Sequence, residues 1–414
     1  MKKLVALLLA LTLCIGLCAC GATAEKPAEE TPATTGETET PATDAKDIKV
    51  GFIFLHDENS TYDLNFINAA KAAAAELGLS DDQIMMKTNI AESQACYDAA
   101  AELVDAGCDL VITDSFGHES FALAAAKEFP EVQFVSCTGV KAHTEGLSNF
   151  HNAFASIYEG RYLAGVAAGL KLNEMIENGD ITAEEAKMGY VGAYPYAEVK
   201  SGYTSFFLGA RSICPSVTME VTFTSSWYDE ALEKEAANKL INNGCVLISQ
   251  HADSMGAPTA CETAGVPNVS YNGSTVAACP NTFIVSSRID WTPFFVYAIN
   301  CVASGEDIGY DWTGTLATGS VVLTDVNEQA AAAGTVEKIA EVMKALEDGS
   351  VKVFDTATFT VNGETVTTYL ADVDDLGDYV GETEAISDGA FLESFYRSAP
   401  YFDLDIDGIT NLDA

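Results

Sequence analysis

The segment KVGFIFLHDENSTYDLNFINAAKAAAAELGLSDDQIMMKTNI (residues 49–90) changes its hydrophobic pattern twice. KVGFIFL (49–55) is a continuous apolar run, as in strands that are buried on both faces of a parallel sheet. TYDLNFINAAKAAAAELGL (61–79) has the length and composition of a helix, which Gly78 ends. IMMKTNI (84–90) is strand-like again. The segment therefore predicts two parallel strands that are joined by a crossover helix.

The same alternation continues along most of the chain. Two series of such units predict an α/β fold with two similar lobes, each a parallel sheet covered by helices on both faces. Near the end, Asn362-Gly363 lies between β-rich flanks and predicts a hairpin over residues 359–370. Further strands are expected at residues 109–115, 133–139, 188–194, 218–227, 245–250, 268–272 and 282–289, and helices at 93–107, 118–128, 153–171, 197–211, 229–243, 254–264, 291–303 and 335–347.

The N-terminus has the pattern of an export signal. Two lysines precede the apolar run Leu4–Leu17, which is too short to span a bilayer as a stable helix. The run ends in LCACG (17–21), which resembles the lipobox of bacterial lipoproteins. This resemblance implies a lipoprotein signal peptide over residues 1–19 and a lipid on the Cys20 thiol, which would anchor the protein to the membrane. An ordinary cleaved signal with incidental cysteines is the alternative.

The stretch after Cys20 differs sharply from the rest of the chain. Residues 20–47 are rich in Thr, Ala, Glu and Pro and contain no aromatic residue. Such a composition cannot bury a core, so the stretch predicts a disordered tether. The folded part is expected to begin near Ile48.

Charge and cysteine usage exclude several classes of partner. The net charge of −40 disfavours binding to nucleic acid and to anionic lipid headgroups. The eleven cysteines form no CxxC motif and no cluster with histidine, so neither a zinc site nor an iron–sulfur site is indicated. We expect no metal and no cofactor, and we interpret most of the later cysteines as small buried hydrophobic residues.

Polar and aromatic residues follow the ends of the predicted strands. In doubly wound sheets ligands bind at the carboxyl ends of the strands, so these residues are candidates for a shared cleft. The alternative for each is an ordinary loop residue or helix cap; Asp253 and Ser254, for example, could cap the helix expected at 254–264. The candidates are Asp57, Ser115, Phe116, Glu198, Trp227, His251, Asp253 and Asn272.

Six stretches, taken in order, resemble one family. The chain is similar, from about Lys49 to Phe354, to the basic membrane lipoprotein family of ABC-transporter substrate-binding proteins, which includes purine-nucleoside receptors. The resemblance implies a type I periplasmic-binding-protein fold, in which two Rossmann-like lobes are joined by a three-strand hinge and close on a ligand. The stretches are TDSFGHES (113–120), EGRYLAGVAAGL (159–170), YVGAYPYAEV (190–199), FFLGARSICPSV (206–217), SSWYDEALEKEAANKLINNG (225–244) and SQHADS (249–254).

The resemblance also implies how the chain divides. The first lobe would comprise residues 48–151 and 287–316, and the second lobe residues 152–286 and 317–414, although the assignment of 335–414 stays open. The hinge would cross near Asn149–Asn152, Val285–Ser287 and Leu316–Gly319.

The matching positions imply a set of ligand-binding residues. Phe116 and Trp227 match aromatic residues that stack on a purine. Glu198 and Asp253 match acidic residues that accept N–H bonds from the base edge. Tyr62 and Asn65 lie where relatives carry an Asp/Asn pair, but the stretch HDENSTYDLNF (56–66) departs from the familiar DxxFN pattern. Ser115 and Asn272 complete the expected set.

One departure concerns the sugar. Nucleoside-binding relatives carry a lysine that meets the sugar, whereas VSSRIDW (285–291) places Ile289 or Asp290 there and Arg288 one step away. On this ground we expect a free purine base to bind at least as well as its nucleoside.

Two other classes of function remain open. A receptor for another small solute, such as a sugar, could use the same aromatic and acidic residues. An enzyme would need a pair such as His251 with Asp253 or His56 with Asp57, but the GxSxG and HExxH motifs are absent, and no GxGxxG follows the first strand. We therefore expect a monomeric, lipid-anchored receptor on the extracytoplasmic face of the cell membrane, with an ABC permease and its ATPase as partners.

Overall fold

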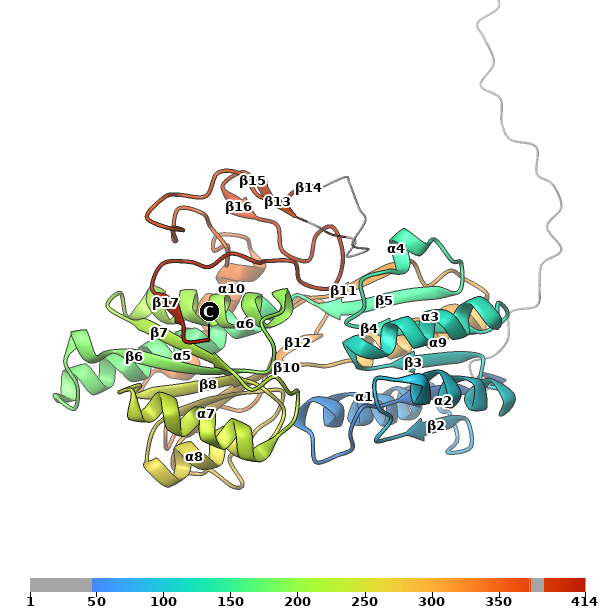
Figure 1. Ribbon diagram of the computed structural model, residues 1–414, viewed down its shortest axis with the longest axis horizontal. Helices are drawn as coiled ribbons and strands as arrows, with labels where there is room; N and C mark the ends of the chain where they lie inside the picture. The colour runs from blue at the N-terminus through green and yellow to red at the C-terminus, as the bar shows by residue number, and fades with distance from the viewer. Residues whose placement is uncertain (1–46, 372, 374–382, 414) are drawn as a thin grey trace, which may run out of the picture. The chain divides into compact units, whose positions relative to one another are not determined.

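A computed structural model describes residues 47–371, 373 and 383–413 of the chain (Figure 1). The expected signal peptide, the tether and Cys20 lie outside these residues. Two large sheets organise the described part, and each sheet with its helices is called a lobe below.

The first lobe is built on a six-stranded sheet with the order β11-β5-β4-β3-β1-β2, all parallel. Helices α1 and α9 pack on one face of the sheet, and α2 and α3 pack on the other. The elements are β1 Val50–Ile53, α1 Thr61–Leu77, β2 Ile84–Lys87, α2 Gln94–Asp105, β3 Leu110–Thr113, α3 Glu119–Glu128, β4 Gln133–Cys137, α4 Ala142–Glu145, β5 Phe150–Ala155, α9 Thr292–Ser304 and β11 Asp311–Gly314.

The second lobe is built on a seven-stranded sheet with the order β12-β10-β9-β8-β6-β7-β17, in which only β12 is antiparallel to its neighbour. Helices α5, α6 and α10 contribute to the core on one face, and α7 and α8 to the core on the other. The elements are α5 Ile157–Asn178, β6 Lys187–Gly192, α6 Ala197–Ile213, β7 Thr218–Phe223, α7 Glu230–Asn242, β8 Leu247–His251, α8 Gly256–Ala264, β9 Asn268–Tyr271, β10 Phe283–Ile289, β12 Val321–Leu323, α10 Thr335–Glu347 and β17 Ile409–Asn411.

The predicted α/β class and the two-lobe arrangement are confirmed. Local sequence explains many of the element boundaries: α1, for example, begins after Ser60, whose side chain accepts from Asp63 N, and ends at Gly78 with φ 68°. Glycine also sets the crossing of α5 and α6. A Cβ at Gly165 would lie 2.0 Å from Phe206 O, and one at Gly209 would lie 2.0 Å from Tyr162 O. The two helix backbones are therefore in direct contact, which no larger residue would permit.

Three connections join the lobes. The chain crosses after β5, after β10, and between β11 and β12. Ser156 N donates to Gly314 O at 2.7 Å, and Asp290 N donates to Ser320 O at 2.7 Å, so backbone hydrogen bonds link the three connections to one another. The first crossing was expected near residues 149–152. It lies a few residues later, because β5 stays in the first sheet through Ala155. The lobe boundaries drawn from the sequence stay a prediction, which the division into two sheets supports.

Two expected elements are wrong in detail. The helix expected at 153–171 begins only at Ile157, because FHNAFA (150–155) is a strand, buried throughout, between β4 and β11. The hairpin expected at 359–370 reduces to a tight turn with one bridge, Val361–Glu364. The residues on either side of the turn pair with other parts of the chain: Asp407 N donates to Thr360 O, and Leu370 in β13 pairs with Glu384 in β14.

The chain after α10, residues 350–413, is called the C-terminal segment. It packs on the second lobe through aromatic residues, among them Phe354, Phe391 and Phe402. Its last strand, β17, lies parallel to β7 at the edge of the second sheet. Its other strands are short: β13 Leu370–Ala371, β14 Thr383–Glu384, β15 Ile386–Ser387 and β16 Ala390–Phe391.

Candidate ligand-binding site

A pocket of about 380 Å³ lies where strand ends of both lobes meet. Most of its lining residues lie within four residues of the carboxyl end of a strand, as expected for parallel sheets. The lining residues are Leu55, His56, Tyr62, Ser115, Phe116 and Thr138 from the first lobe and Glu198, Trp227, His251, Asp253 and Asn272 from the second.

The pocket brings together most of the residues that the sequence pointed to. Asn65 and Asp57 are the exceptions and lie outside the pocket. Asn65 Nδ2 donates to Thr61 O at 3.2 Å and to Asn272 O at 2.9 Å, and Asp57 Oδ1 accepts from Asn59 Nδ2 at 2.8 Å. Sequence reasoning missed Leu55 and Thr138 and left His56 without a binding role. Leu55 ends an apolar run, and Thr138 lies inside the segment 133–139 that was expected to be strand, so neither stood out as a residue beyond a strand end. The expected residues that line the pocket are Tyr62, Ser115, Phe116, Glu198, Trp227, Asp253 and Asn272.

Asp253 is a buried carboxylate in the pocket wall. Its Oδ1 accepts from Asn272 Nδ2 at 3.0 Å, and its backbone N donates to Trp227 O at 3.0 Å. Burial raises the pKa of Asp253 well above its usual value, and the nearby carboxylates add to this shift. The interpretation of Asp253 as a helix cap is wrong, because α8 begins only at Gly256, whose N donates to Ser254 Oγ.

The loop that carries Asp253 is held by a second buried acid. Glu233 Oε1 accepts from Ser254 N and from Asp229 N, both at 3.2 Å, and Oε2 accepts from Ser254 N at 3.3 Å. Burial raises the pKa of Glu233 to about 7. Glu233 therefore acts as a positioning residue, because it fixes the backbone directly after Asp253.

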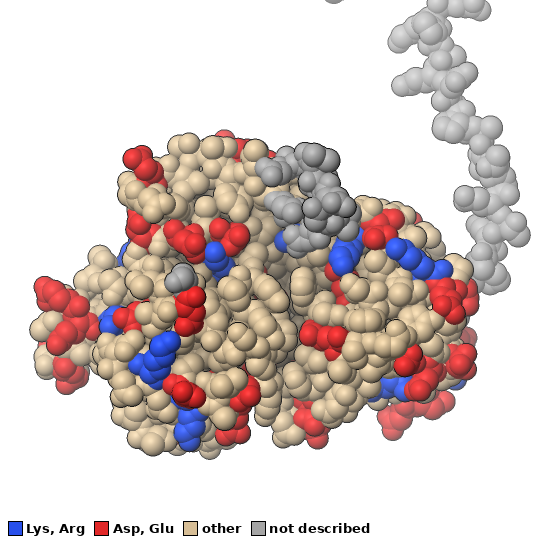
Figure 2. All heavy atoms as spheres, viewed as in Figure 1, with Lys and Arg blue, Asp and Glu red and all other residues tan. Residues whose placement is uncertain are grey.

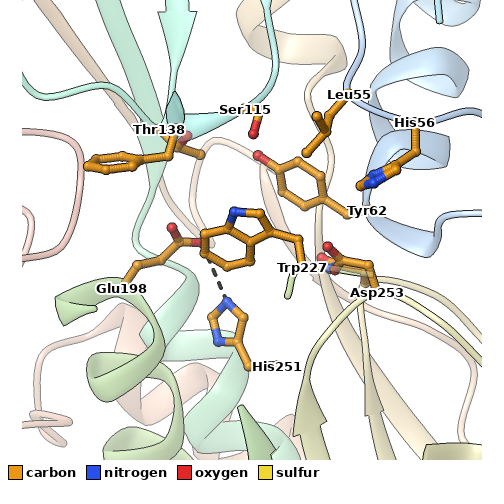
Figure 3. A pocket seen from close by; sticks show the side chains of 11 residues that line it. Leu55, His56, Tyr62, Ser115, Thr138, Glu198, Trp227, His251 and Asp253 are labelled. Atoms are coloured by element: carbon orange, nitrogen blue, oxygen red, sulfur yellow. Dashed lines mark hydrogen bonds and ion pairs between the residues drawn. The ribbon is translucent and has the colours of Figure 1, made fainter. Parts of the chain in front are cut away.

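The floor of the pocket carries a histidine–glutamate pair. His251 Nε2 lies 3.4 Å from Glu198 Oε1, and Figure 3 shows this contact beneath the Trp227 ring. Burial lowers the pKa of His251, which favours the neutral ring. Its Nδ1 has no hydrogen-bond partner among the described residues and faces Gly202, where a Cβ would lie 2.8 Å away. The geometry thus assigns the proton to Nε2, with Glu198 as its acceptor.

A buried arginine lies near this pair. Arg161 is fully buried, and its Nη2 donates to Ser249 Oγ at 2.8 Å and to Tyr190 OH at 3.0 Å. Its guanidinium carbon also lies 5.0 Å from the centre of the Tyr271 ring, and that ring contacts His251 at 4.5 Å. The positive charge of Arg161 therefore supports the neutral form of His251.

Aromatic side chains form a cluster along one side of the pocket. Trp227 meets Tyr194 edge-on at 5.1 Å and lies 6.1 Å from Tyr196. Phe116, from the first lobe, lies 5.8 Å from the same Tyr196 ring and is 38% exposed. Figure 3 shows the Trp227 indole in the middle of the pocket, between Tyr62 and His251. A planar ligand in this pocket would therefore meet aromatic faces.

Neither pair considered for an enzyme is formed. His251 contacts Glu198, whereas Asp253 bonds to Asn272. His56 Nδ1 lies 3.3 Å from Asp63 Oδ2, whereas Asp57 accepts from Asn59 Nδ2 at 2.8 Å. Within the described ranges, no group of three or more side chains is placed to hold a metal ion.

Two further properties concern interactions of the protein: the charge of its surface and the length and hydropathy of its helices. Figure 2 shows acidic side chains scattered over the visible face with fewer basic ones among them, in keeping with the net charge of −40. Among the helices that the structure describes, none is both long enough and apolar enough to cross a membrane.

The family comparison finds a match over most of the chain. The family model for PnrA-like ABC transporter substrate-binding proteins matches residues 53–353. A purine-binding protein of Brucella abortus (strain 2308) is 31% identical, covering 62% of this chain and 69% of that protein. A putative ABC transporter glucose-binding protein of Haloferax volcanii is also 31% identical, covering 52% of each, so this chain spans about half its length.

Solved structures support the same architecture. ABC transporter system solute-binding proteins of Aeropyrum pernix K1 align with a TM-score of 0.61 at 18% identity, covering 74% of this chain and 93% of theirs. A solute-binding protein of Conexibacter woesei aligns with a TM-score of 0.57 at 19% identity, covering 74% of this chain and 98% of its own. At these identities the likeness shows the fold alone.

Proposed function

Because the chain belongs to the PnrA-like family of ABC transporter substrate-binding proteins, we propose that its pocket binds a purine base or a purine nucleoside. The observation that carries this proposal is the combination of Trp227 with a buried carboxylate, Asp253, in one pocket that both lobes line. The purine-binding relative in Brucella abortus supports the same ligand class.

The aromatic side chains supply affinity for a flat heterocycle. Trp227 and Phe116 come from different lobes, so a base that contacts both is held only when the lobes are close together. Stacking of a base on an aromatic ring contributes about 1–3 kcal/mol. This makes the two rings the main apolar contacts of the proposed ligand.

The carboxylates would orient the ligand through hydrogen bonds. Asp253 is buried beside Asn272, and a buried carboxylate is stabilised by N–H donors. A purine presents ring and exocyclic N–H groups at its edge, which match an acidic acceptor. Glu198 offers a second acceptor, although one of its oxygens already contacts His251.

A sugar is the second candidate ligand. The Haloferax volcanii relative is described as a putative glucose-binding protein. Sugar rings also stack on aromatic side chains, and their hydroxyls donate hydrogen bonds to carboxylates. The same pocket therefore offers suitable contacts for a sugar. The purine is preferred because the family resemblance assigns Trp227, Phe116, Glu198 and Asp253 to contacts with a base, and because a purine-binding relative is among the matches.

The wider transport role follows from the family. We propose that a lipid on Cys20 anchors the protein outside the cytoplasm. We propose further that the protein is a monomer, does not chemically change its ligand, and delivers it to an ABC permease with its ATPase. Cys20 lies outside the described residues, and the LCACG (17–21) motif is the support for the anchor.

A thermal-unfolding screen tests the ligand class. A ligand that binds only the native state raises the apparent melting temperature in proportion to the logarithm of its concentration. We expect adenine, guanine or their nucleosides to raise it, and monosaccharides to leave it unchanged. A shift with monosaccharides alone would replace the purine by a sugar.

A further inference from the structure

Two aspartates, Asp63 and Asp114, lie buried next to the first-lobe wall of the pocket and are called the acid pair. Both are 0% exposed, and neither lines the pocket itself. Asp63 belongs to the first turn of α1, and Asp114 directly follows β3. Their carboxyl groups lie within hydrogen-bonding distance of each other. The pair therefore joins two of the chain segments from which the first-lobe wall is built.

The acid pair holds three residues that line the pocket. Asp114 Oδ1 accepts from Leu55 N at 3.1 Å, and Asp63 Oδ1 accepts from His56 N at 2.7 Å. Tyr62 donates its hydroxyl to Asp114 O at 2.6 Å. Leu55, His56 and Tyr62 are half of the first-lobe residues that line the pocket (Figure 3). The position of this wall thus depends on the two aspartates.

The same hydrogen bonds extend to the second lobe. Ser60, which caps α1, donates its hydroxyl to Asp63 Oδ2 at 2.5 Å. The next residue, Thr61, donates its N–H and its hydroxyl to Asp253 O, at 3.1 and 3.2 Å. Asp253 belongs to the second-lobe wall of the pocket. A shift of the first turn of α1 would therefore disturb both walls.

The surroundings offer little positive charge to the acid pair. Among the residues that the structure describes, no lysine or arginine forms an ion pair with either carboxyl group. His118 Nδ1 lies 3.7 Å from Asp114 Oδ1, but burial lowers the pKa of this histidine, and its Nε2 bonds to Ile90 O. His56 Nδ1 lies 3.3 Å from Asp63 Oδ2 and can supply one charge at most. Ionisation of both adjacent buried carboxyl groups is therefore strongly unfavourable.

The contacts favour Asp114 as the carrier of one proton. Asp63 lies at the N-terminus of α1, where the helix dipole stabilises a negative charge. Burial would raise the pKa of Asp63, but the hydrogen bonds that it accepts lower it. Asp114 Oδ2 is buried and receives no hydrogen bond from the described residues, and burial and then the charge of Asp63 raise the pKa of Asp114. A proton on this oxygen, donated to Asp63, would satisfy both groups.

We propose that the acid pair holds one proton, with Asp114 as the donor and Asp63 as the acceptor, and that this hydrogen bond positions the first-lobe wall for the ligand. Both aspartates are positioning residues, because neither lines the pocket. The effect on binding rests on the proposed function, whereas the shared proton does not.

Two substitutions of Asp114 separate the hydrogen bond from the negative charge. Asparagine has the shape of a protonated aspartate: its Oδ1 can accept from Leu55 N, and its Nδ2 can donate to Asp63. Alanine retains neither bond and leaves the buried groups of both partners unsatisfied. The proposal requires the bond at this position and no charge, so asparagine should replace Asp114 and alanine should not.

Infrared difference spectroscopy at neutral pH tests the shared proton. A protonated carboxyl group has a C=O stretch that is resolved from those of carboxylates and backbone amides. We expect the parent protein to show a carboxylic C=O band that is lost in Asp114→Asn. Asp105→Asn, the same change at an exposed residue of α2, should keep this band. Equal carboxylic bands in the parent and in Asp114→Asn would overturn the shared proton.

Calorimetry with adenine, guanine and their nucleosides tests the positioning. For the compound that binds most tightly, Asp114→Asn and Asp105→Asn should retain the parent affinity, whereas Asp114→Ala should weaken it at least about ten-fold, which is about 1.4 kcal/mol. A ten-fold loss in folded Asp114→Asn would show that binding needs the charge and would overturn the proposal. Full affinity in folded Asp114→Ala would overturn the positioning role.

Circular dichroism shows whether each variant is folded. If Asp114→Ala is not, Ser60→Ala takes its place, because it removes a hydrogen bond to Asp63 from outside the pair and should also weaken binding. Full affinity in Ser60→Ala would then overturn the positioning role. Binding of none of the four compounds to the parent would overturn the proposed function and the effect on binding, while the infrared band would still decide the shared proton.

Discussion

Asn272 donates its Nδ2–H to Asp253 Oδ1 at 3.0 Å, and Asn65 in turn donates to Asn272 O at 2.9 Å. The first lobe therefore supports, through one asparagine, the carboxylate that the second lobe presents to the pocket. Asn272 has a φ of 67°, a left-handed conformation that asparagine tolerates better than most residues. This explains why Asn65, although it lies outside the pocket, bears on the binding site.

Replacing Asp253 should weaken purine binding. Asp253→Ala removes a charged acceptor, so we expect a loss of roughly 1.5–3 kcal/mol by calorimetry. Burial raises the pKa of Asp253, so acidification favours its neutral form and affinity should fall as the pH is lowered. The exposed Asp81→Ala is the control; full affinity in folded Asp253→Ala would remove Asp253 from the site.

Trp227 should report ligand binding through its fluorescence. If it stacks on the base, Trp227→Ala weakens binding by about 1–3 kcal/mol. Trp227→Phe should abolish the fluorescence change on binding, whereas Trp312→Phe, which packs against Phe294 in the first lobe, should keep it. A fluorescence change that survives in Trp227→Phe would contradict the stacking.

Glu233 should make stability depend on pH. Its pKa rises from 4.5 to about 7 on folding, so the folded protein favours the protonated form. Its stabilising effect is therefore complete below pH 4.5 and is lost as the pH rises through about 7. Glu233→Gln should reduce the change of the melting temperature between pH 5 and pH 8. Glu235→Gln, at an exposed residue of the same helix, should leave this change as it is in the parent protein. An identical pH profile in Glu233→Gln and the parent would exclude this role.

The lobes should close on ligand. Contacts made to both lobes favour the closed arrangement, and the three hydrogen-bonded connections are where the backbone would bend. Small-angle scattering should show a smaller radius of gyration at saturating purine. No change at saturation would count against closure.

Cys20 should anchor the protein. Cys20→Ser removes the thiol that would carry the lipid, so the variant should move from the membrane fraction to the soluble fraction of cells. Cys96→Ser, at a buried cysteine, is the control and should stay with the membranes. Membrane association of Cys20→Ser equal to that of the parent would contradict the lipobox.

Seven of the eight residues that the sequence pointed to as ligand-binding line the pocket, because strand ends can be read from apolar runs; that they bind a ligand stays a prediction. It predicted β5 poorly, because His151 and Asn152 interrupt the apolar pattern. Both are buried, and their partners come from elsewhere in the chain: His151 Nδ1 bonds to Gly309 O, and Asn152 Nδ2 to Ser136 O. The cavity that Thr138 and Tyr401 both line was beyond prediction for a similar reason, since only the fold brings these distant parts of the chain to one space.

Strand β17 has a consequence for the order in which the protein folds. β7 lies at the edge of the second sheet until Ile409–Asn411 pairs with it, and almost half of the chain separates the two strands in sequence. Contacts of such long sequence separation form slowly, because a large loop must close first. During synthesis β7 is therefore an open edge that can pair with other chains. A chain that stops before residue 409 would keep this edge open and would be prone to aggregation.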